Sequence, residues 1–301
     1  MRRHSHPGRP RSRRWPVRAG LVLTALAVLT GCGGGTTEGI DVDVATDATF
    51  PAGTSMARFA KAGTVTIGVK YDQPGIGYLR PGSQTPTGFD VEIGKIVAAG
   101  MGIAPKDITW TETVSKNRES YLQQGTVDLV IASYSITDER RKVVGQAGPY
   151  YVTGQQLLVR ADDSSITGPG DLSGKRVCSV TGSTSLATVQ EQYDAKPVPF
   201  ATYSECVQQL KNGTVDAVTT DGAILLGYAA ENPDTLKVVG EPFSTERYGI
   251  GYRHGDTALC QYLTDTLKRA IDDGTWRKAF DATLGQSGVK APEPPTPDPC
   301  Q

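Results

Sequence analysis

The sequence predicts an α/β protein of two lobes, and three observations lead to that class. From about Ala60 onward, short β-rich runs alternate with amphipathic helical segments, which is typical of layered α/β proteins. A second series of such segments begins near Asp171 and repeats the architecture of the first. Two further strands, 154–160 and 248–252, flank this second series. We therefore expect one α/β unit inserted into another, each lobe a small sheet flanked by helices, joined by two crossing strands.

The first lobe is predicted to follow a βαβαβ order. Its elements are strand 65–69, a helix from 89 to 101, strand 108–110, a short helix 118–124 and strand 127–132. Apolar residues recur at helical spacing from Phe89 to Met101 and make one face of the helix. The run 127–132 reads as a buried strand that leads into a polar turn.

The second lobe is predicted to repeat this order. Its elements are strand 176–180, a helix after Thr181, strand 198–200, helix 204–212, strand 217–219 and helix 224–232. Helices follow with apolar stripes at Leu259, Leu263, Leu267 and Ile271, and at Trp276, Phe280 and Leu284. The expected boundaries are 60–158 plus 249–286 for lobe 1, 159–248 for lobe 2 and 287–301 for a Pro-rich tail. Open α/β sheets bind ligands where the carboxyl ends of strands meet loops, so we expect a site in the cleft between the lobes.

Residues 1–31 have the pattern of a lipoprotein signal peptide. They contain basic residues and no acid, and the apolar run Ala19–Leu29 is too short to span a bilayer. The run closes in Leu-Thr-Gly-Cys at 29–32, which matches the lipobox pattern, so Cys32 is the expected lipidation site and mature N-terminus. The alternative is an ordinary signal peptide with a cysteine nearby.

A lipid-anchored Cys32 would place the protein on the extracytoplasmic face of the cell membrane. Two acyl chains on one residue give a stable anchor, whereas a single chain is marginal. Residues 32–59 are predicted to be the lipidated cysteine and a flexible tether, because the stretch up to Pro51 has little to pack.

Charge and cysteine content exclude some classes of function. Seven of the 31 basic residues lie in the leader, so the mature chain carries 24 against 32 acids, a balance that disfavours nucleic-acid binding. Four cysteines remain besides Cys32: Cys178, Cys206, Cys260 and Cys300. Three connectivities are open, and we favour Cys178–Cys206 and Cys260–Cys300 because each pair would lie within one lobe. We expect no metal site, since no paired Cys or His spacing occurs.

Seven short motifs occur in a fixed order along residues 60–286. They are GFD at 88–90, GTVD at 125–128, SITDER at 135–140, GPYY at 148–151, DLSGK at 171–175, GTVDA at 213–217 and DGTW at 273–276. With these motifs the chain resembles the family 3 extracellular solute-binding proteins, the polar-amino-acid receptors of ABC importers. The resemblance implies the two-lobed periplasmic-binding-protein fold, an amino-acid ligand, an ABC permease as partner, a monomer, no cofactor and no enzymatic activity.

The segment 133–140 is the expected binding site for the ligand's α-carboxylate. It reads as a strand end running into a helical turn, and a guanidinium fork suits a carboxylate because two parallel hydrogen bonds fix its orientation. The resemblance implies that Arg140 holds the carboxylate and that Ser133 and Ser135 add backbone and hydroxyl bonds. Tyr134, between them, belongs to the expected binding set. The alternative for Arg140 is a solvated charge on a helix surface.

The second lobe is expected to contribute Asp221, Ser183 and Thr184. The resemblance implies that Asp221 faces the ligand's α-amine, and the alternative for it is a helix N-cap. Ser183 and Thr184 open a helix whose free N–H groups can bind an anion. Phe89 is either an apolar wall for the ligand's methylenes or a core residue.

Lys70 and Arg118 are the expected readers of the ligand's side chain. By the resemblance, glutamate and aspartate receptors have a base at the position of Lys70, and the step Asn117-Arg118 matches one that binds the distal carboxylate. A basic pair would pair with a buried carboxylate and repel lysine or arginine. We therefore favour glutamate or aspartate, followed by glutamine or asparagine. Alternatively, both residues lie on the rim and only steer anions.

The mechanism implied is capture by closure of the two lobes, followed by delivery to a permease. One alternative is a receptor that signals to a membrane partner, which would share every cleft residue. A less favoured alternative is an enzyme resembling cyclohexadienyl dehydratases. It is disfavoured because we find no nucleophile–base pair, and His254 is the one histidine in the lobes.

Overall fold

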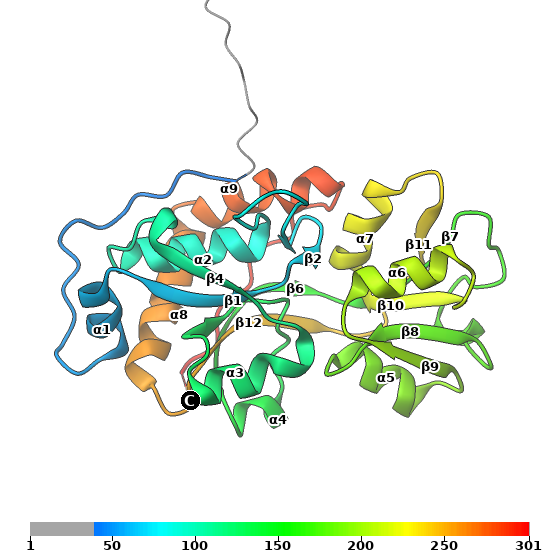
Figure 1. The fold of residues 1–301 in the computed structure, drawn as a ribbon, viewed down its shortest axis with the longest axis horizontal. Coiled ribbons are helices and arrows are strands. Elements are labelled where there is room, and N and C mark those ends of the chain that lie inside the picture. Colours follow the sequence, from blue (N-terminus) through cyan, green and yellow to red (C-terminus); the bar gives the residue numbers. More distant parts are fainter. Residues whose placement is uncertain (1–38, 301) are drawn as a thin grey trace, which may run out of the picture. The chain divides into compact units, whose positions relative to one another are not determined.

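The computed structural model describes residues 39–300, and it contains two five-stranded sheets (Figure 1). The predicted signal peptide and Cys32 lie outside the described residues. The first sheet has the order β4 (Ile108–Glu112), β1 (Val65–Val69), β5 (Leu129–Val130), β12 (Glu246–Tyr252) and β6 (Gly145–Thr153). The second has the order β11 (Leu236–Val239), β7 (Gln155–Arg160), β10 (Ala217–Asp221), β8 (Arg176–Val180) and β9 (Lys196–Phe200). A small hairpin pairs β2 (Asp72–Gln73) with β3 (Gly77–Tyr78).

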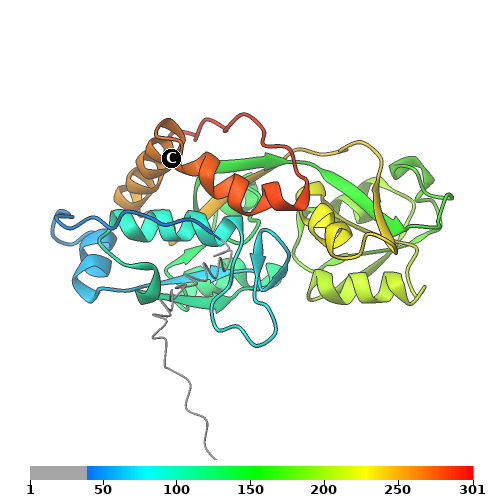
Figure 2. The ribbon, with the colours of Figure 1, turned by 90° about the horizontal axis from the view of Figure 1, so that it is seen from above.

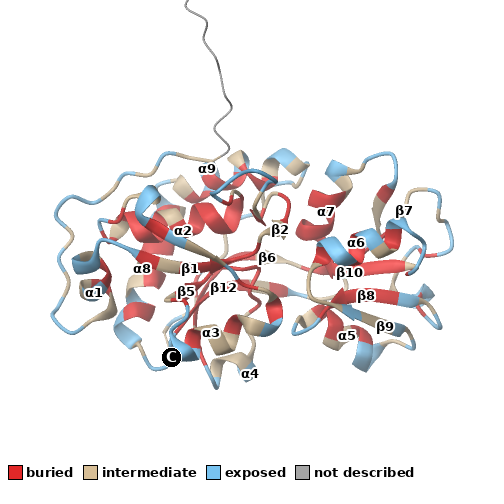
Figure 3. Cartoon of the chain, viewed as in Figure 1, coloured by how far each residue is buried: buried red, intermediate tan, exposed pale blue. Residues whose placement is uncertain are grey.

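Helices cover these sheets, and the central strands are buried beneath them (Figure 3). Around the first sheet lie α1 (Ser55–Ala62), α2 (Phe89–Gly100), η1 (Pro105–Asp107), η2 (Ser115–Asn117), α3 (Arg118–Gln124), α4 (Asp138–Arg141), α8 (Thr257–Asp272), α9 (Thr275–Ala282) and η4 (Leu284–Ser287). Around the second lie η3 (Pro169–Asp171), α5 (Thr184–Gln192), α6 (Tyr203–Lys211) and α7 (Gly222–Glu231). The predicted α/β fold class, with two lobes each built on a sheet, is confirmed.

Parallel pairing brings strand ends together on the side that carries the site. β1 pairs in parallel with β4 and with β5, and β8 pairs in parallel with β9 and β10. Each sheet also contains antiparallel strands, since β12 runs against β5 and β6, and β7 runs against β10 and β11. The loops that follow β5, β8 and β10 are therefore the ones that carry polar side chains toward the cleft.

The chain passes between the lobes at two adjacent segments. The first crossing is at Gly154, between β6 and β7, and the second lies between β11 and β12. The two segments touch, because the Gln155 N–H donates to Ser244 Oγ at 3.0 Å and a Cβ on Gly154 would lie 2.5 Å from the Ser244 carbonyl oxygen. These crossings lie a few residues before the boundaries expected after 158 and after 248, because strand pattern alone does not show to which sheet a crossing strand belongs.

The N-terminal segment is packed rather than free. Ile40, Val42 and Phe50 pack against the hydrophobic core, and the Ile40 N–H donates to the buried Glu92 carboxylate at 3.1 Å. Helix α1 buries further apolar side chains, including Phe59. The prediction of a flexible tether is wrong for residues 40–59, because scattered apolar residues suffice to dock a segment without regular periodicity.

Both favoured disulfides form, Cys178–Cys206 and Cys260–Cys300. The second ties the C-terminal segment to α8, and Figure 2 shows that segment (red) running back from α9. Asp298 in this segment pairs with Arg141 at 2.9 Å and with Arg247 at 2.6 Å. In the described part of the chain, no helix has the length and hydropathy needed to cross a bilayer.

Candidate ligand-binding site

A narrow, nearly filled cavity of about 10 Å³ lies between the two lobes. Its lining residues are Ser115, Arg118, Ser133, Ser135, Ser183, Thr184, Ser185, Tyr203, Thr220, Asp221 and Ile224. Hydroxyl groups dominate this wall, and one cation and one anion accompany them. The cavity therefore lies where the sequence predicts it, and it brings together six of the predicted site residues, which are Arg118, Ser133, Ser135, Ser183, Thr184 and Asp221.

Arg118, at the start of α3, is a buried cation held by neutral carbonyl groups. Its Nε donates to the Ser115 carbonyl at 3.2 Å, and Nη1 donates to the carbonyls of Ala132 and Ser133 at 3.1 and 3.2 Å. Nη2 donates across the cleft to the Gly182 carbonyl at 3.2 Å. Burial, and then the charge of Arg140, lower the pKa of Arg118 to about 10, so the group stays protonated at neutral pH. It is suited to hold an anionic group of a ligand.

Asp221, at the end of β10, is a buried carboxylate with one oxygen that lacks a partner. Its Oδ2 accepts a hydrogen bond from the Tyr248 hydroxyl at 2.5 Å, while Oδ1 is buried and unpartnered. Burial, and then the charge of Glu246, raise the pKa of Asp221 to about 7. Although it stands at the N-cap position of α7, its side chain makes no capping hydrogen bond. This arrangement fits an ammonium partner better than it fits a helix cap.

Lys70 follows β1 and is only 3% exposed, so it does not lie on the rim of the cleft. Its Nζ donates to Ser115 Oγ at 2.8 Å, and Ser115 lines the cavity. Burial, and then the neighbouring charge of Arg118, lower the pKa of Lys70 to about 7. Lys70 therefore reaches the cavity through Ser115.

Arg140 is not a solvated surface charge, because its side chain is only 11% exposed. Its Nη1 donates to the Ser135 carbonyl at 2.7 Å, Nη2 to the Gly182 carbonyl at 3.1 Å, and Nε pairs with Glu119 at 3.2 Å. Arg140 lies beside the cavity, where it is hydrogen-bonded to the lining residue Ser135. Contact with a ligand carboxylate at this position stays a prediction.

Tyr134 lies between the two guanidinium residues and the core. Its ring centroid is 4.5 Å from the Arg118 guanidinium carbon and 5.0 Å from that of Arg140, which are cation–π distances. Its hydroxyl donates to Glu119 at 2.8 Å. The side chain is fully buried, so the structure places Tyr134 behind the cavity wall, where it holds both arginines.

Ser133 is held in a left-handed backbone conformation, with φ of 42°, three residues after the end of β5. Its N–H donates to Asp90 Oδ2 at 2.7 Å, and Asp90 Oδ1 accepts from the Tyr150 hydroxyl at 2.7 Å. Strained non-glycine residues cluster at binding sites when the surroundings determine them. Asp90 is such a surrounding group, and sequence analysis registered it only as part of the GFD motif.

The loop after β8 presents a helix N-terminus to the cavity. Ser183 caps α5, because its Oγ accepts from the Leu186 N–H at 3.0 Å, and Thr184 Oγ1 donates to Glu246 at 3.0 Å. Sequence analysis missed five lining residues: Ser115, Ser185, Tyr203, Thr220 and Ile224. Tyr203 had a local signal, since the capping box of Thr202 and Glu205 fixes it at the first turn of α6.

Phe89 lies in the core of lobe 1. Its ring contacts those of Tyr151, Trp276 and Phe280 at centroid distances of 5.6 to 5.8 Å. It is 1% exposed and does not belong to the described cavity lining, so its position matches the core alternative. Among residues 39–300, no group of three or more His, Cys, Asp or Glu is arranged to hold a metal ion.

Comparison with known proteins agrees with this geometry. The sequence profile of the bacterial extracellular solute-binding proteins, family 3, matches residues 65–286. The chain belongs to this family. The family 3 chain is 40% identical over 235 residues to the glutamate-binding protein of Corynebacterium efficiens, covering 74% of this chain and 80% of that protein. It is 36% identical to the glutamine-binding protein of an ABC transporter of Bacillus subtilis, covering 72% and 79%. These named relatives are solute-binding proteins, in agreement with the prediction that the chain is not an enzyme.

Solved structures of similar fold are also amino-acid-binding proteins. An ancestral arginine-binding protein bound to glutamine has a TM-score of 0.70 and 35% identity, covering 74% of this family 3 chain and 98% of that protein. The L-cysteine receptor of Neisseria gonorrhoeae has a TM-score of 0.73 and 28% identity, covering 78% and 96%. Members of the family act outside the cytoplasm.

Proposed function

We propose that this chain captures an acidic amino acid, glutamate or aspartate, by closure of its lobes and delivers it to an ABC permease. The observation that carries the proposal is that one small cavity is lined both by Asp221, which has an oxygen without a partner, and by the buried Arg118. An acidic amino acid carries an ammonium for Asp221 and a side-chain carboxylate for Arg118, so it satisfies both groups at once. The glutamate-binding relative supports the ligand class.

The cavity also supports selection by the side chain. Besides Arg118, Lys70 is buried against Ser115, so a second anionic group of the ligand would find a cation on the same wall. A neutral carboxamide would leave the Lys70 charge without an anion, and a guanidinium or ammonium side chain would bring like charges together. We therefore rank glutamate and aspartate above glutamine, and glutamine above arginine.

Arg140 is the proposed partner of the α-carboxylate, with Ser133 and Ser135 beside it. Both Arg118 and Arg140 donate to the same Gly182 carbonyl. A carboxylate is a stronger acceptor than a carbonyl, so an incoming ligand would take one of these donors from Gly182.

Two further parts of the proposal concern the cell. We propose that Cys32 is lipidated and that the chain is held, as a monomer, on the extracytoplasmic face of the membrane. The lipobox at 29–32 supports this placement. The named ABC-transporter relative supports a permease as the partner that receives the ligand.

The test is isothermal titration calorimetry of the leaderless protein with each common amino acid. We expect binding of glutamate or aspartate with a dissociation constant near micromolar, or about −8 kcal/mol. Arg140→Ala should abolish binding of all amino acids, whereas Arg118→Ala should weaken acidic ligands most. Asp162→Asn, an exposed acid in lobe 2, is the matched control and should bind as the wild type does.

The outcomes separate the alternatives. If no amino acid binds, the proposed function is wrong. If glutamine or arginine binds more tightly than glutamate, the proposed selectivity is wrong. If glutamate binds but deletion of the gene leaves uptake of labelled glutamate unchanged, the receptor signals to a membrane partner and does not feed an importer.

A further inference from the structure

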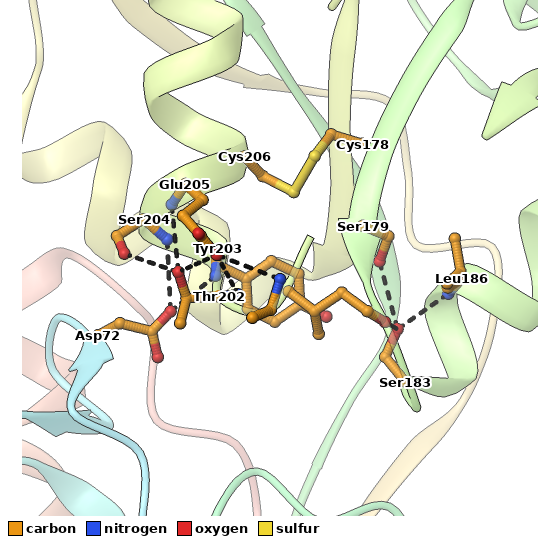
Figure 4. The surroundings of a disulfide bond; sticks show 12 residues. Asp72, Cys178, Ser179, Ser183, Leu186, Thr202, Tyr203, Ser204, Glu205 and Cys206 are labelled. Carbon is orange, nitrogen blue, oxygen red and sulfur yellow. Dashed lines mark hydrogen bonds between the residues drawn. A yellow bond between two sulfur atoms is a disulfide. The ribbon is translucent and has the colours of Figure 1, made fainter. Parts of the chain in front are cut away.

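The two lobes touch at a second place, which holds no predicted ligand contact. Here the turn of lobe 1 at residues 72–75 meets the N-terminal end of α6 and the middle of α7 in lobe 2. Figure 4 shows Asp72 pointing toward the first residues of α6. We define the latch as Asp72 and Pro74 on one side, with Tyr203, Gly227 and Tyr228 on the other. Starting from the proposed function, we infer that the latch, which Tyr203 joins through its main-chain N–H, sets the ligand's affinity and residence time by stabilising the closed lobes.

Hydrogen bonds make up the first half of the latch. Asp72 Oδ2 accepts from the N–H groups of Tyr203 and Ser204, at 2.7 and 3.3 Å. The Tyr228 hydroxyl donates to the Asp72 main-chain carbonyl. A carboxylate at a helix N-terminus binds free N–H groups and is favoured by the helix dipole, and here the two partners come from different lobes. These bonds exist only while the lobes are closed.

A close backbone approach makes up the second half. A Cβ added at Gly227 would lie 2.3 Å from the Pro74 carbonyl oxygen and 3.2 Å from its carbon. Gly227 lies inside α7, where an alanine is otherwise the more favourable residue. The glycine therefore has no local advantage for the helix, and it permits the contact between the lobes.

The turn that carries Pro74 is rigid. The carbonyls of Gly75 and Ile76 accept the N–H groups of Phe89 and Asp90, at 3.0 and 2.9 Å, which fastens the turn to the start of α2. A clash at Gly227 is therefore not relieved by a small movement of the turn.

The latch is mechanically joined to the ligand site. Tyr203 donates its N–H to Asp72, and its side chain lines the cavity. The disulfide between Cys206 of α6 and Cys178 of β8 fastens the same helix to the strand that leads to Ser183 (Figure 4). Release of the latch would therefore open the wall formed by Tyr203 and the Ser183 loop together.

The decisive variant is Gly227→Ala, because it changes no charge and leaves the ligand contacts in place. We expect it to weaken binding of glutamate about 30-fold, since the apparent dissociation constant rises as the closed fraction falls. The dissociation rate should rise while the association rate changes little, because the ligand docks before closure. Gly170→Ala, at an exposed glycine with no atom within 4 Å of the added Cβ, is the control.

Asp72→Asn tests the hydrogen-bonded half and should weaken binding about tenfold. Its control is Asp162→Asn, which removes the same charge from an exposed site. Fluorescence energy transfer between one label on each lobe reports closure directly, and circular dichroism shows that the lobes stay folded. In both latch variants the ligand-saturated protein should populate a longer distance between the lobes.

Unchanged affinity, dissociation rate and lobe distance in Gly227→Ala would overturn the latch. Loss of binding together with loss of helical signal would also overturn it, since Gly227 would then serve the fold of lobe 2. If the wild type binds no amino acid, the proposed function fails, and the latch is judged on the ligand-free lobe distances alone. In that case identical distance distributions in the wild type and both variants overturn it.

Discussion

Replacing Asp221 by asparagine should make the unliganded protein more stable while it removes binding. The wild-type carboxyl is buried, has one oxygen without a partner, and has a pKa of about 7 instead of 3.8. The difference corresponds to about 4 kcal/mol of unfolding free energy at pH 8, where the group must be ionised in the folded state. An asparagine removes that cost, but its Nδ2 would also lack a partner, so we expect a net gain of about 2 kcal/mol.

The pH dependence fixes the sign of the effect. Because the folded-state pKa of Asp221 is raised, its contribution to stability is fully present below pH 3.8 and is lost as the pH rises through about 7. The advantage of Asp221→Asn should therefore be absent or reversed near pH 4, grow between pH 4 and 7, and level off above pH 7. Thermal unfolding at pH 4, 6 and 8 measures it, and about 2 kcal/mol corresponds to roughly 4–8 °C at pH 8.

The same titration must appear in binding. An ammonium ligand requires the ionised carboxylate, so the wild-type affinity should fall about tenfold per pH unit below about pH 7. If Asp221→Asn is as stable as the wild type or less stable at every pH, the carboxylate is not desolvated. The assignment of Asp221 as the partner of the α-ammonium would then lose its physical basis.

Three further variants test other parts of the structure. Gly182→Ala should weaken glutamate binding at least tenfold in calorimetry, because the added Cβ would lie 2.8 Å from Lys116 Cα across the cleft. Unchanged affinity would show that this contact is not part of the closed state. Lys70 has a pKa of about 7, so the wild type should lose affinity for glutamate above pH 7 as Lys70 becomes neutral. In Lys70→Met, calorimetry should show no such decrease above pH 7. If the decrease persists in the variant, Lys70 does not have this role. Changing both Cys260 and Cys300 to Ser should lower the unfolding free energy by about 4 kcal/mol, because the disulfide closes a loop with a sequence separation of 40. Ligand binding at 25 °C should stay intact. An unchanged chemical denaturation curve would show that the disulfide of the tail does not stabilise the fold.

The sequence predicts the two sheets well because their strands are short, apolar and separated by clear helical periodicity. The strand Val65–Val69 is predicted with the bounds that the structure has, and so is 176–180. Boundaries between the lobes are less well predicted. Gly154 and the residues before Glu246 change sheets within extended chain, and only hydrogen-bond partners reveal where this happens.

Site residues divide in the same way. Side chains that follow strand ends, such as Ser133, Ser183 and Asp221, could be predicted because topology places strand ends at the cleft. Tyr203 and Ile224 lie in helices whose first turns face the cleft, and helical periodicity does not say which turn faces another lobe. The latch escaped prediction for the same reason, since a glycine within a helical pattern gives no sign of the backbone that approaches it.

Electrostatics connects these elements into one account of binding. Burial makes ionisation of both Asp221 and Lys70 unfavourable, and each has a pKa of about 7. A ligand with an ammonium and two carboxylates neutralises Asp221 and the Lys70–Arg118 side together, whereas glutamine leaves the second cation without an anion. Selectivity for an acidic amino acid would then appear mainly in how completely each ligand closes the lobes. For this reason, the distance between the lobes should be shorter with glutamate bound than with glutamine bound. If the two ligands differed only in their contacts within lobe 1, the two distances would be the same.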